Sequence, residues 1–420
     1  MPAKTVAPAA TGGSSSAGAG SGSAGDGMEG KYCIVTGANS GIGYEVARGL
    51  MQRGAHVVMA CRNAAACEAA AERLRAEALP GSCACRRLDL EDHASIRAFA
   101  AEQAAELAAA AATPAATPAS AGGRAGGCAA RRGRIDVLVN NAGVMGVAPA
   151  PDGTDRHLTA NHFGPYLLTR LLLPHMAAGG GEAEPGARAA AAGAGATAEA
   201  AGAAAGGGGG GRVVNVASRA HYAGRLALVT GPPGSERVAD DTRHWWWQYA
   251  RSKLCNVLFT AELQRRYGSG GSGGGGSGGG GGSGGGGNLY GGIIATAVSP
   301  GLVDSGIFRY LLPEWAQWLK APLRPLGLFR TPAQGAEVVI YAASSPDLDR
   351  RGGGEAGGGV SPTPKGAPGG GAGAAAPPLF LHDCREMQPS AAARDPRLAA
   401  DLWRVSAALV GLPDEEDTAP

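Results

Sequence analysis

A tyrosine, a lysine and a serine in the second half of the chain have the types and spacing of an acid–base site. Tyr249 and Lys253, in the stretch YARSK, are four residues apart and therefore share one face of a helix. A tyrosine hydroxyl ordinarily has a pKa of ~10, and a neighbouring ammonium favours the phenolate, so we expect Lys253 to lower the pKa of Tyr249. This spacing is common by chance, but it gains weight from Ser218 at the end of the apolar run RVVNVASRA. Together these residues predict that Tyr249 acts as a general acid or base near neutral pH.

A glycine-rich turn near the beginning of the chain predicts where a cofactor binds. The stretch TGANSGIG follows a short apolar strand and opens a helical run. Gly37 permits the tight turn, Gly41 lets backbone approach a pyrophosphate, and Gly43 lets the helix pack on the strand. The free N–H groups at the start of the helix then face the phosphates. The residues assigned to cofactor binding in this turn are Gly37, Asn39, Ser40, Gly41, Ile42 and Gly43.

The residues after the second and third strands bear on which cofactor binds. An acid after the second strand would bond the ribose hydroxyls and select NAD, but this chain has Cys61 and Arg62 there. Arg62 suits the 2′-phosphate of NADP, so we expect NADP(H), with a solvated surface arginine as the alternative. Asp89, followed by Leu90, could accept a bond from the adenine amino group or could cap a turn. Spacing alone favours neither of these two readings.

The motif NNAG ends the fourth apolar run. Asparagine tolerates unusual backbone conformations and offers amide bonds between strands, and Gly143 allows a cofactor to lie against the backbone. A turn without a ligand is the alternative. We assign Asn141, Ala142 and Gly143 to cofactor binding because the motif follows a strand of the type IDVLV.

Apolar runs typical of strands alternate with helical stretches, and both must position these residues. The runs are nearly continuous in Val, Ile, Leu and Ala, as expected when both faces of a sheet are covered. The alternation predicts an α/β fold: a single doubly wound, Rossmann-type domain over residues 28–415 with a parallel seven-stranded sheet. The expected strands are Tyr32–Thr36, His56–Ala60, Ala84–Leu88, Val137–Asn140, Arg212–Ala217, Ile293–Val298 and Leu379–His382. The expected helices include Gly43–Arg53, Ala64–Leu79, His93–Leu107, Asp155–Met176, Trp247–Tyr267 and Pro332–Ser344.

Tracts of Gly, Ser and Ala interrupt this pattern. They form a leader over residues 1–27 and internal blocks at about 104–131, 177–211, 268–287 and 352–376. With almost no large apolar side chains they are expected to be disordered, although 104–112 could extend a helix. Without them roughly 290 residues remain, which suits one large domain. Each internal block is a low-complexity insertion in a helix-to-strand loop. Ligands bind at the carboxyl ends of the strands, so we expect these insertions on the opposite side of the sheet, away from the active site.

Composition excludes several classes of protein. The net charge of +2 argues against nucleic-acid binding, and no apolar run approaches the roughly 18 residues of a membrane span. The leader lacks the apolar core of a signal peptide, so we expect a cytoplasmic protein, with a plastid transit peptide as the alternative. Among 8 cysteines, Cys33 and Cys61 are expected to be buried thiols. Cys83 and Cys85 do not have zinc-site spacing, so we expect no metal, no structural disulfide and a reduced compartment.

Taken in order, these motifs resemble those of the short-chain dehydrogenase/reductase family. TGANSGIG, Asp89, NNAG, Ser218, and Tyr249 with Lys253 match its motifs in order and spacing once the insertions are skipped. NHFGPYLLTRLLLP resembles the segment with the family's catalytic asparagine, here Asn161. SPGLV resembles its Pro-Gly loop beside the nicotinamide, which adds Pro300, Gly301 and Val303 to the expected cofactor contacts.

A narrower resemblance is to the retinol dehydrogenase branch of this family. SKLCNVLFTAEL, RTPAQGAEVVIYAA and the closing stretch FLHDCREMQPS are similar to segments of that branch. One departure is Asp304-Ser305 after the Pro-Gly pair, where threonine is common in the family. Ser305 is then the expected substitute for the bond to the cofactor's carboxamide.

The resemblance implies roles for four catalytic residues. Ser218 would polarise the substrate carbonyl, and Tyr249 would donate the proton as hydride leaves nicotinamide C4. Lys253 would hold the ribose hydroxyls and tune Tyr249, which gives both residues a part in cofactor binding as well. Asn161 would hold a water that relays the proton to solvent. Each of them acts on charge that develops on oxygen in the transition state.

The implied function is NADP(H)-dependent interconversion of a lipophilic aldehyde or ketone and its alcohol. Double-bond reduction of the protochlorophyllide reductase type is an alternative, and a catalytically silent nucleotide-binding scaffold is another. The expected partner is a small lipophilic substrate, without nucleic acid or a transmembrane segment; peripheral membrane contact and a homodimer stay open. An apolar strip after the Pro-Gly loop suits a lid over such a substrate, although core or membrane surface are alternatives. The strip consists of Phe308, Tyr310, Leu311, Leu312, Trp315, Trp318 and Leu319.

Overall fold

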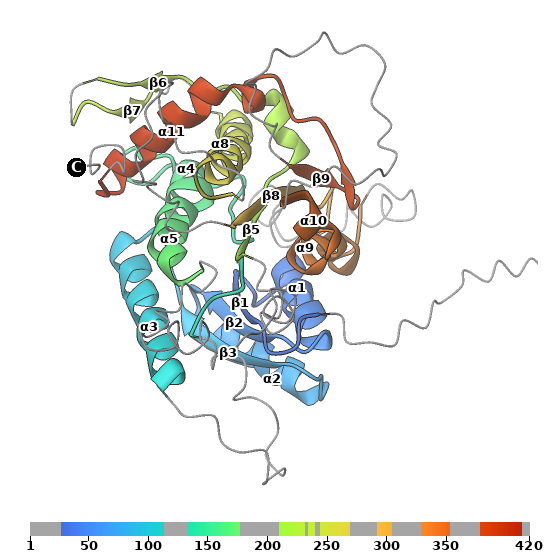
Figure 1. The fold of residues 1–420 in the computed structure, drawn as a ribbon. Coiled ribbons are helices and arrows are strands. Elements are labelled where there is room, and N and C mark those ends of the chain that lie inside the picture. Colours follow the sequence, from blue (N-terminus) through green and yellow to red (C-terminus); the bar gives the residue numbers. More distant parts are fainter. Residues whose placement is uncertain are drawn as a thin grey trace, which may run out of the picture.

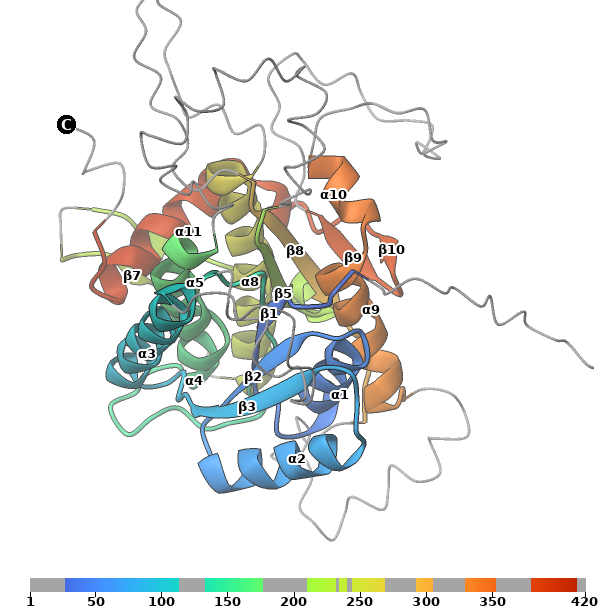
Figure 2. The same ribbon diagram turned by 60° about the horizontal axis from the view of Figure 1, so that its bottom comes forward.

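An eight-stranded sheet between two layers of helices organises the protein (Figures 1 and 2). The computed structural model describes residues 27–112, 133–176, 210–231, 234–239, 244–268, 292–304, 329–352 and 379–413. The strand order is β10-β9-β8-β5-β4-β1-β2-β3, and every neighbouring pair except β10 with β9 is parallel. The predicted α/β, doubly wound fold is therefore confirmed.

All strands of this sheet except the last lie close to their predicted positions. They are β1 (Tyr32–Thr36), β2 (His56–Cys61), β3 (Ser82–Arg87), β4 (Val137–Asn140), β5 (Arg212–Val216), β8 (Ile294–Ser299), β9 (Phe380–His382) and β10 (Arg385–Glu386). Two short strands, β6 (Leu228–Val229) and β7 (Arg237–Val238), form a separate antiparallel pair.

The helices lie in the connections between the strands, except for the last helix, which follows β10. They are α1 (Gly41–Gln52), α2 (Ala64–Ala76), α3 (His93–Ala112), α4 (Arg156–Leu158), α5 (Gly164–Leu172), α8 (Trp245–Tyr267), α9 (Pro332–Ser344), α10 (Asp347–Gly352) and α11 (Pro396–Leu409). The expected extension of a helix over residues 104–112 is confirmed by α3. The expected single helix over Asp155–Met176 is divided, because a π-helical stretch, Thr159–Phe163, lies between α4 and α5 and a 3-10 turn, Leu173–His175, follows.

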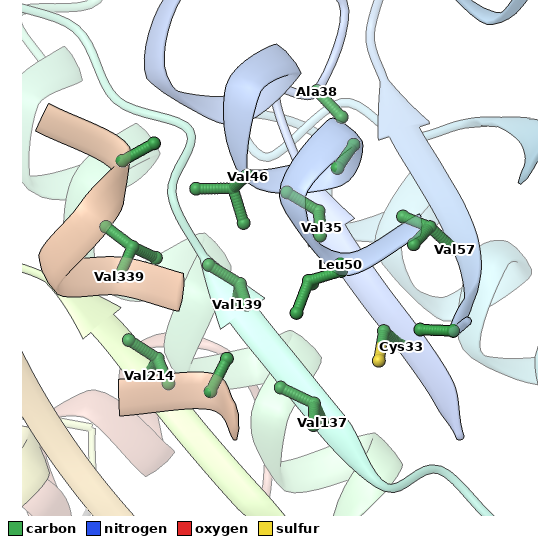
Figure 3. Packing of buried hydrophobic residues seen from close by; sticks show 14 of the residues in the cluster. Cys33, Val35, Ala38, Val46, Leu50, Val57, Val137, Val139, Val214 and Val339 are labelled. Carbon is green, nitrogen blue, oxygen red and sulfur yellow. The ribbon is translucent and has the colours of Figure 1, made fainter. Parts of the chain in front are cut away.

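Alternation along the strands gives the sheet two buried faces. On β1, Cys33 and Val35 face the layer of α1, α2 and α9, where Val46 and Leu50 of α1 join the same apolar cluster (Figure 3). Tyr32 and Ile34 face the opposite layer of α3, α5, α8 and α11. Burial of both faces holds the carboxyl ends of the strands in register and so fixes the edge at which ligands bind.

The eighth strand corrects the predicted count of seven. β10 returns antiparallel to β9 through Asp383 and Cys384, whose φ angles are 53° and 57°. A two-residue turn with both residues in the left-handed region is ordinarily marked by Asn-Gly or Asp-Gly. Because Cys384 occupies the position usually taken by glycine, the sequence carries no clear signal for this hairpin.

The expectation of no structural disulfide is wrong. Cys67 of α2 and Cys85 of β3 are joined by a disulfide, with Cα atoms 6.0 Å apart, a separation typical of disulfides. The packing of α2 on β3 brings together two cysteines that are 18 residues apart in the chain. Cys33 and Cys61 are buried free thiols, as predicted.

The four internal low-complexity blocks fall mostly outside the described residues, as does almost all of the leader. Their described flanks still show where they attach. Residues 113–132, 177–209, 269–291 and 353–378 each follow a helical element and precede the amino end of β4, β5, β8 or β9. The ends of one block are adjacent, because the N–H of Ile293 donates to the carbonyl oxygen of Tyr267 at 3.0 Å. None of the helices in the described part of the chain is long and apolar enough to cross a membrane.

Candidate active site

The glycine-rich turn and the NNAG motif meet where the strand order reverses, between β1 and β4. The side-chain amide of Asn141 donates to the carbonyl oxygen of Thr36 at 2.8 Å. In return, the backbone N–H groups of Asn141 and Ala142 both donate to the Thr36 hydroxyl at 3.0 Å. These bonds tie the two strand ends together at the position where doubly wound sheets bind nucleotides.

The start of α1 is arranged to receive an anion. Gly37 and Gly41 have φ angles of 67° and 57°, which favour glycine, so the chain turns sharply before the helix. Ser40 is the N-cap residue, but its side chain makes no capping hydrogen bond, and the first turn contains no acid. The N–H groups of the first turn and the helix dipole are therefore suited to a phosphate.

A cavity of about 1410 Å³ extends along the carboxyl ends of the strands. This volume exceeds that of ordinary small-molecule pockets, which suits a dinucleotide together with a substrate. Three of the four predicted catalytic residues, Ser218, Tyr249 and Lys253, line it. All predicted cofactor residues line it as well: Gly37, Asn39, Ser40, Gly41, Ile42, Gly43, Arg62, Asp89, Leu90, Asn141, Ala142, Gly143, Tyr249, Lys253, Pro300, Gly301 and Val303.

Gly143 separates the cavity from Asn161. A Cβ atom on Gly143 would lie 3.1 Å from Oδ1 of Asn161 and 3.6 Å from Nζ of Lys253. The absent side chain thus leaves open the space in front of the lysine ammonium, so the residues here fit the ribose and nicotinamide of a dinucleotide.

Tyr249, Lys253 and Ser218 come together from two elements. α8 carries Tyr249 and Lys253 on one face, and Ser218 is the N-cap of the 3-10 helix Arg219–Ala223 that follows β5. Nζ of Lys253 lies 5.7 Å from the centroid of the Tyr249 ring and donates to the carbonyl oxygen of Val216 at 2.8 Å. The Ser218 hydroxyl accepts from the N–H of Ala220 at 3.1 Å, which orients it at the end of β5.

Burial, and not the neighbouring lysine, dominates the ionisation of this pair. Burial raises the pKa of Tyr249 to about 12, although a hydrogen bond with Ser218 opposes the rise. Burial also lowers the pKa of Lys253 to about 8. The pKa of Tyr249 thus lies above its ordinary value, whereas the sequence led us to expect a lowered one. Tyr249 is protonated at neutral pH, which is the form that donates a proton.

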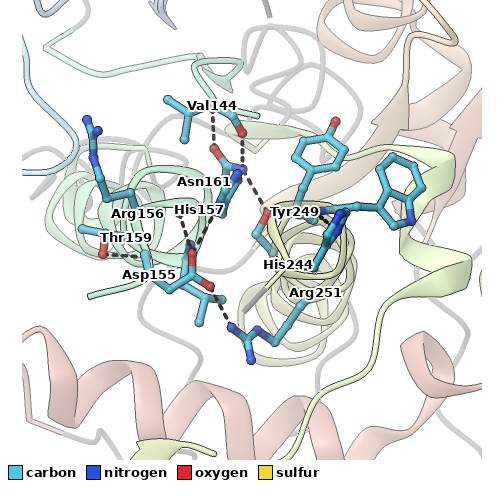
Figure 4. Close-up of polar contacts among 12 residues, drawn as sticks. Val144, Asp155, Arg156, His157, Thr159, Asn161, His244, Tyr249 and Arg251 are labelled. Atoms are coloured by element: carbon cyan, nitrogen blue, oxygen red, sulfur yellow. Dashed lines mark hydrogen bonds and ion pairs between the residues drawn. The ribbon is translucent and has the colours of Figure 1, made fainter. Parts of the chain in front are cut away.

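The Asn161 side chain is held by three hydrogen bonds (Figure 4). Its Oδ1 accepts from the N–H of Val144 at 2.7 Å, and its Nδ2 donates to the carbonyl oxygen of Val144 at 3.0 Å and to Oγ of Ser252 at 2.9 Å. Both amide hydrogens are thus engaged. The water-holding role expected for Asn161 stays a prediction. Asn161 itself lies in the π-helical stretch, a feature that often marks functional sites.

A buried ion pair fixes the helix that carries Tyr249 (Figure 4). Asp155 caps α4, and its Oδ2 accepts from Nη2 of Arg251 on α8 at 2.7 Å. Burial raises the pKa of Asp155, but hydrogen bonds from His157 and Arg251 outweigh it and leave that pKa below its ordinary value. The charged pair holds α4 against α8 at Arg251, which lies two residues after Tyr249.

The adenosine end of the cavity contains a residue that sequence reasoning missed. Arg62 lines the cavity after β2, as predicted, and its Nη1 lies 3.2 Å from Oε2 of Glu91. Glu91 also lines the cavity. Asp89 accepts from the N–H of Glu91 at 3.1 Å, so it caps a turn while still facing the cavity. The two roles predicted for Asp89 are therefore compatible with each other. Glu91 is the residue that sequence reasoning missed, because no signal in the sequence singled it out.

Apolar side chains surround Tyr249 at the other end. Met145, Ala220 and Ala250 form a cluster with the Tyr249 ring, and Trp245 and Trp246 pack against it. Trp245 and Trp246 line the cavity, whereas Trp247 is 48% exposed, because three adjacent residues of a helix cannot all share one face. The predicted lid strip, Phe308 to Leu319, lies outside the described residues.

The Pro-Gly loop is completed by a segment distant in the sequence. Val303 bridges to Arg330, and the N–H of Asp304 donates to the carbonyl oxygen of Arg330 at 2.9 Å. Arg330 lines the cavity beside Gly301 and forms an ion pair with Asp383. Sequence spacing could not place Arg330 here, because the backbone bridge creates the proximity. Ser305, the expected substitute for threonine, lies outside the described residues.

Comparison with known proteins agrees with this architecture. The family profile described as short chain dehydrogenase matches residues 31–112 and 115–184. Retinol dehydrogenase 12 of Mus musculus is 31% identical over 389 residues, which cover 92% of this chain and 88% of that protein. The chain belongs to the short-chain dehydrogenase/reductase family. The expected resemblance to the retinol dehydrogenase branch is confirmed as well.

Two further similarities support this assignment. Dehydrogenase/reductase SDR family member 13 of Homo sapiens is 30% identical, with 94% of this chain and 76% of that protein covered. The crystal structure of an uncharacterised protein from Mycobacterium paratuberculosis superposes with a TM-score of 0.51 at 26% identity, over 92% of this chain and 95% of the other. The protein is therefore an oxidoreductase of this family that acts on alcohol or carbonyl groups.

Proposed function

We propose that the protein interconverts a lipophilic aldehyde or ketone and its alcohol with NADP(H). The observation that carries this proposal is the cavity, in which Ser218, Tyr249 and Lys253 face an apolar cluster at one end. Arg62 lines the same cavity at the other end. The names of similar proteins, retinol dehydrogenase 12 and the polyprenol dehydrogenase of Danio rerio, refer to lipophilic alcohols and support the same substrate class.

The chain's own residues transfer the proton and orient the substrate and the cofactor. When bound, the nicotinamide cofactor supplies the hydride that reaches the carbonyl carbon. The Ser218 hydroxyl donates to the carbonyl oxygen, and Tyr249, protonated at neutral pH, gives that oxygen its proton. Lys253 has three N–H donors and uses one for Val216, so it also has donors for the ribose hydroxyls. Met145, Trp245 and Trp246 exclude water around Tyr249, which strengthens each of these polar interactions.

The substrate class is tested by loss of NADPH absorbance with a panel of carbonyl compounds. Apolar aldehydes and ketones should show higher kcat/KM than polar ones of equal size, because the cluster around Tyr249 offers apolar contacts. Reduction of none of these compounds by a protein that still binds NADPH would instead support the nucleotide-binding scaffold. Light-dependent reduction of a tetrapyrrole double bond would support the protochlorophyllide reductase type.

The cofactor preference is tested by comparing NADPH with NADH, because Arg62 stands where an acid would select NAD. Arg62→Asp should remove a charge-assisted bond to the 2′-phosphate, worth about 1.5–3 kcal/mol, and so lower kcat/KM with NADPH by about one to two orders of magnitude. Equal catalytic efficiency with both cofactors in the unaltered protein would contradict the preference.

A further inference from the structure

The guanidinium of Arg62 forms an ion pair with a carboxylate of the same chain. Arg62 meets Glu91 through one contact of 3.2 Å, between Nη1 and Oε2. The Arg62 side chain is 52% exposed and that of Glu91 is 20% exposed, so the pair lies at the rim of the cavity. A carboxylate at this position competes with a phosphate for the same guanidinium donors.

Arg156 holds the same carboxylate more firmly. Its Nε lies 2.6 Å from Oε1 of Glu91 and its Nη2 lies 2.8 Å from Oε2, which is a bidentate arrangement. Arg156 stands at the beginning of α4, far from Arg62 in the sequence, and is absent from the cavity lining. The carboxylate is thus bound by two contacts on one side and by a single contact on the side of Arg62.

We propose that Glu91 and Arg156 set how strongly the enzyme prefers NADP(H), by controlling how readily Arg62 leaves its carboxylate partner for the 2′-phosphate. This inference rests on the proposed preference for NADP(H). Glu91 is a positioning residue that opposes phosphate binding, and Arg156 weakens that opposition by drawing the carboxylate away. Removing the Glu91 carboxylate and removing the Arg156 guanidinium should therefore change the preference for NADP(H) in opposite directions.

The measured quantity is the ratio of the dissociation constants for NADH and NADPH, obtained by fluorescence titration of the full chain. Glu91→Gln should raise the ratio in favour of NADPH by about two- to fivefold, the range expected for an exposed ion pair. Arg156→Gln should lower it by about the same factor, because Glu91 then pairs more fully with Arg62. The matched control is Glu68→Gln, which removes an exposed carboxylate on α2 that pairs with Arg75. It should leave the ratio unchanged.

A double-mutant cycle tests whether Glu91 acts through Arg62. In an Arg62→Met background, Glu91→Gln should no longer change the ratio, because the competing guanidinium is gone. A change as large as in the unaltered protein would overturn the inference, since Glu91 would then act on the cofactor directly. A ratio that moves in the same direction in the Glu91 and Arg156 variants, or in neither, would also overturn it.

Failure of the underlying cofactor preference gives a different result. If the unaltered protein binds NADPH and NADH equally well, the proposed preference is wrong together with this inference. If the unaltered protein prefers NADPH but Arg62→Met leaves the ratio unchanged, Arg62 does not bind the 2′-phosphate and this inference is wrong, while the preference stands. If Arg62→Met lowers the ratio but Glu91→Gln does not raise it, only the role of Glu91 is wrong.

Discussion

Tyr249 and Lys253 are both shifted toward their neutral forms by burial, and this determines how the site can work at each pH. Burial raises the pKa of Tyr249 to about 12, so the hydroxyl keeps its proton over the physiological range. Burial lowers the pKa of Lys253 to about 8, so its ammonium loses its proton within the range of ordinary assays. Lys253 therefore titrates within the pH range of such assays, whereas Tyr249 titrates above it.

Removal of the Tyr249 hydroxyl should abolish turnover while leaving cofactor binding. Tyr249→Phe keeps the ring that packs against Met145 and Trp246, so only the proton donor is lost. General acid catalysis supplies about 10²–10⁴-fold, and the bond to the forming alkoxide is lost as well, so turnover should fall by about three orders of magnitude or more. NADPH titration by fluorescence checks that binding persists. A variant that keeps more than about a tenth of the turnover would show that Tyr249 is not the acid.

The charge of Lys253 should make NADPH binding depend on pH. The folded pKa of this base is lowered, so the ammonium is present below pH about 8 and is lost as the pH rises through that value. Because the ammonium attracts an anionic cofactor, the dissociation constant of NADPH should rise between pH 7 and 9.5. In Lys253→Met the constant should be higher and nearly independent of pH over this range. A pH dependence that survives in Lys253→Met would assign it to another group.

At the scale of elements, the phosphate site depends on the close packing of α1, at Gly43, against Gly37 and Asn141 at the ends of β1 and β4. A Cβ atom on Gly43 would lie 2.5 Å from Nδ2 of Asn141 and closer still to the carbonyl oxygen of Gly37. Gly43→Ala should therefore push α1 away from β1 and break the bond between Asn141 and Thr36. We expect a loss of about 1–3 kcal/mol in stability, as for other overpacked sites, and weaker NADPH binding.

Thermal unfolding and NADPH titration measure both effects of Gly43→Ala. Glu45→Ala is the matched control, because it changes the same helix away from the strand ends, where Glu45 pairs only loosely with Arg48 at 3.8 Å. Its stability and affinity should stay close to those of the unaltered protein. Equal behaviour of the two variants would contradict the tight packing assigned to Gly43.

At the scale of the whole molecule, the sheet separates the site from the points where the low-complexity blocks attach. The cavity lies at the carboxyl ends of the strands, whereas residues 269–291 lead into the amino end of β8. The ends of this block are already adjacent, since Ile293 donates to Tyr267 at 3.0 Å. A short turn can therefore replace the block without moving either element.

Replacement of residues 269–291 by a short turn should leave KM for both substrates nearly unchanged. Stability should rise by about 1–2 kcal/mol, because a shorter loop costs less closure entropy. Steady-state kinetics and thermal unfolding measure the two expectations. A large rise in either KM, with the fold intact by circular dichroism, would show that this block reaches the site.

The sequence alone predicts most of the strands, the helices that follow them and the order of the motifs. These features depend on local signals: apolar runs, a glycine turn between a strand and a helix, and the spacing of four between Tyr249 and Lys253. Local signals predict these elements correctly because residues close in the sequence constrain one another's conformation directly. The Rossmann-type topology then follows, since parallel strands with helical crossovers leave few arrangements.

Contacts between distant residues were decided only by the tertiary structure. The partners of Asn161, the Arg62–Glu91–Arg156 cluster, the bridge from Val303 to Arg330 and the disulfide between Cys67 and Cys85 each join separate elements. The pKa of Tyr249 belongs to the same class, because burial by the surrounding elements raises it. Sequence spacing determines which side chains share an element, but desolvation and side-chain pairing depend on how the elements pack.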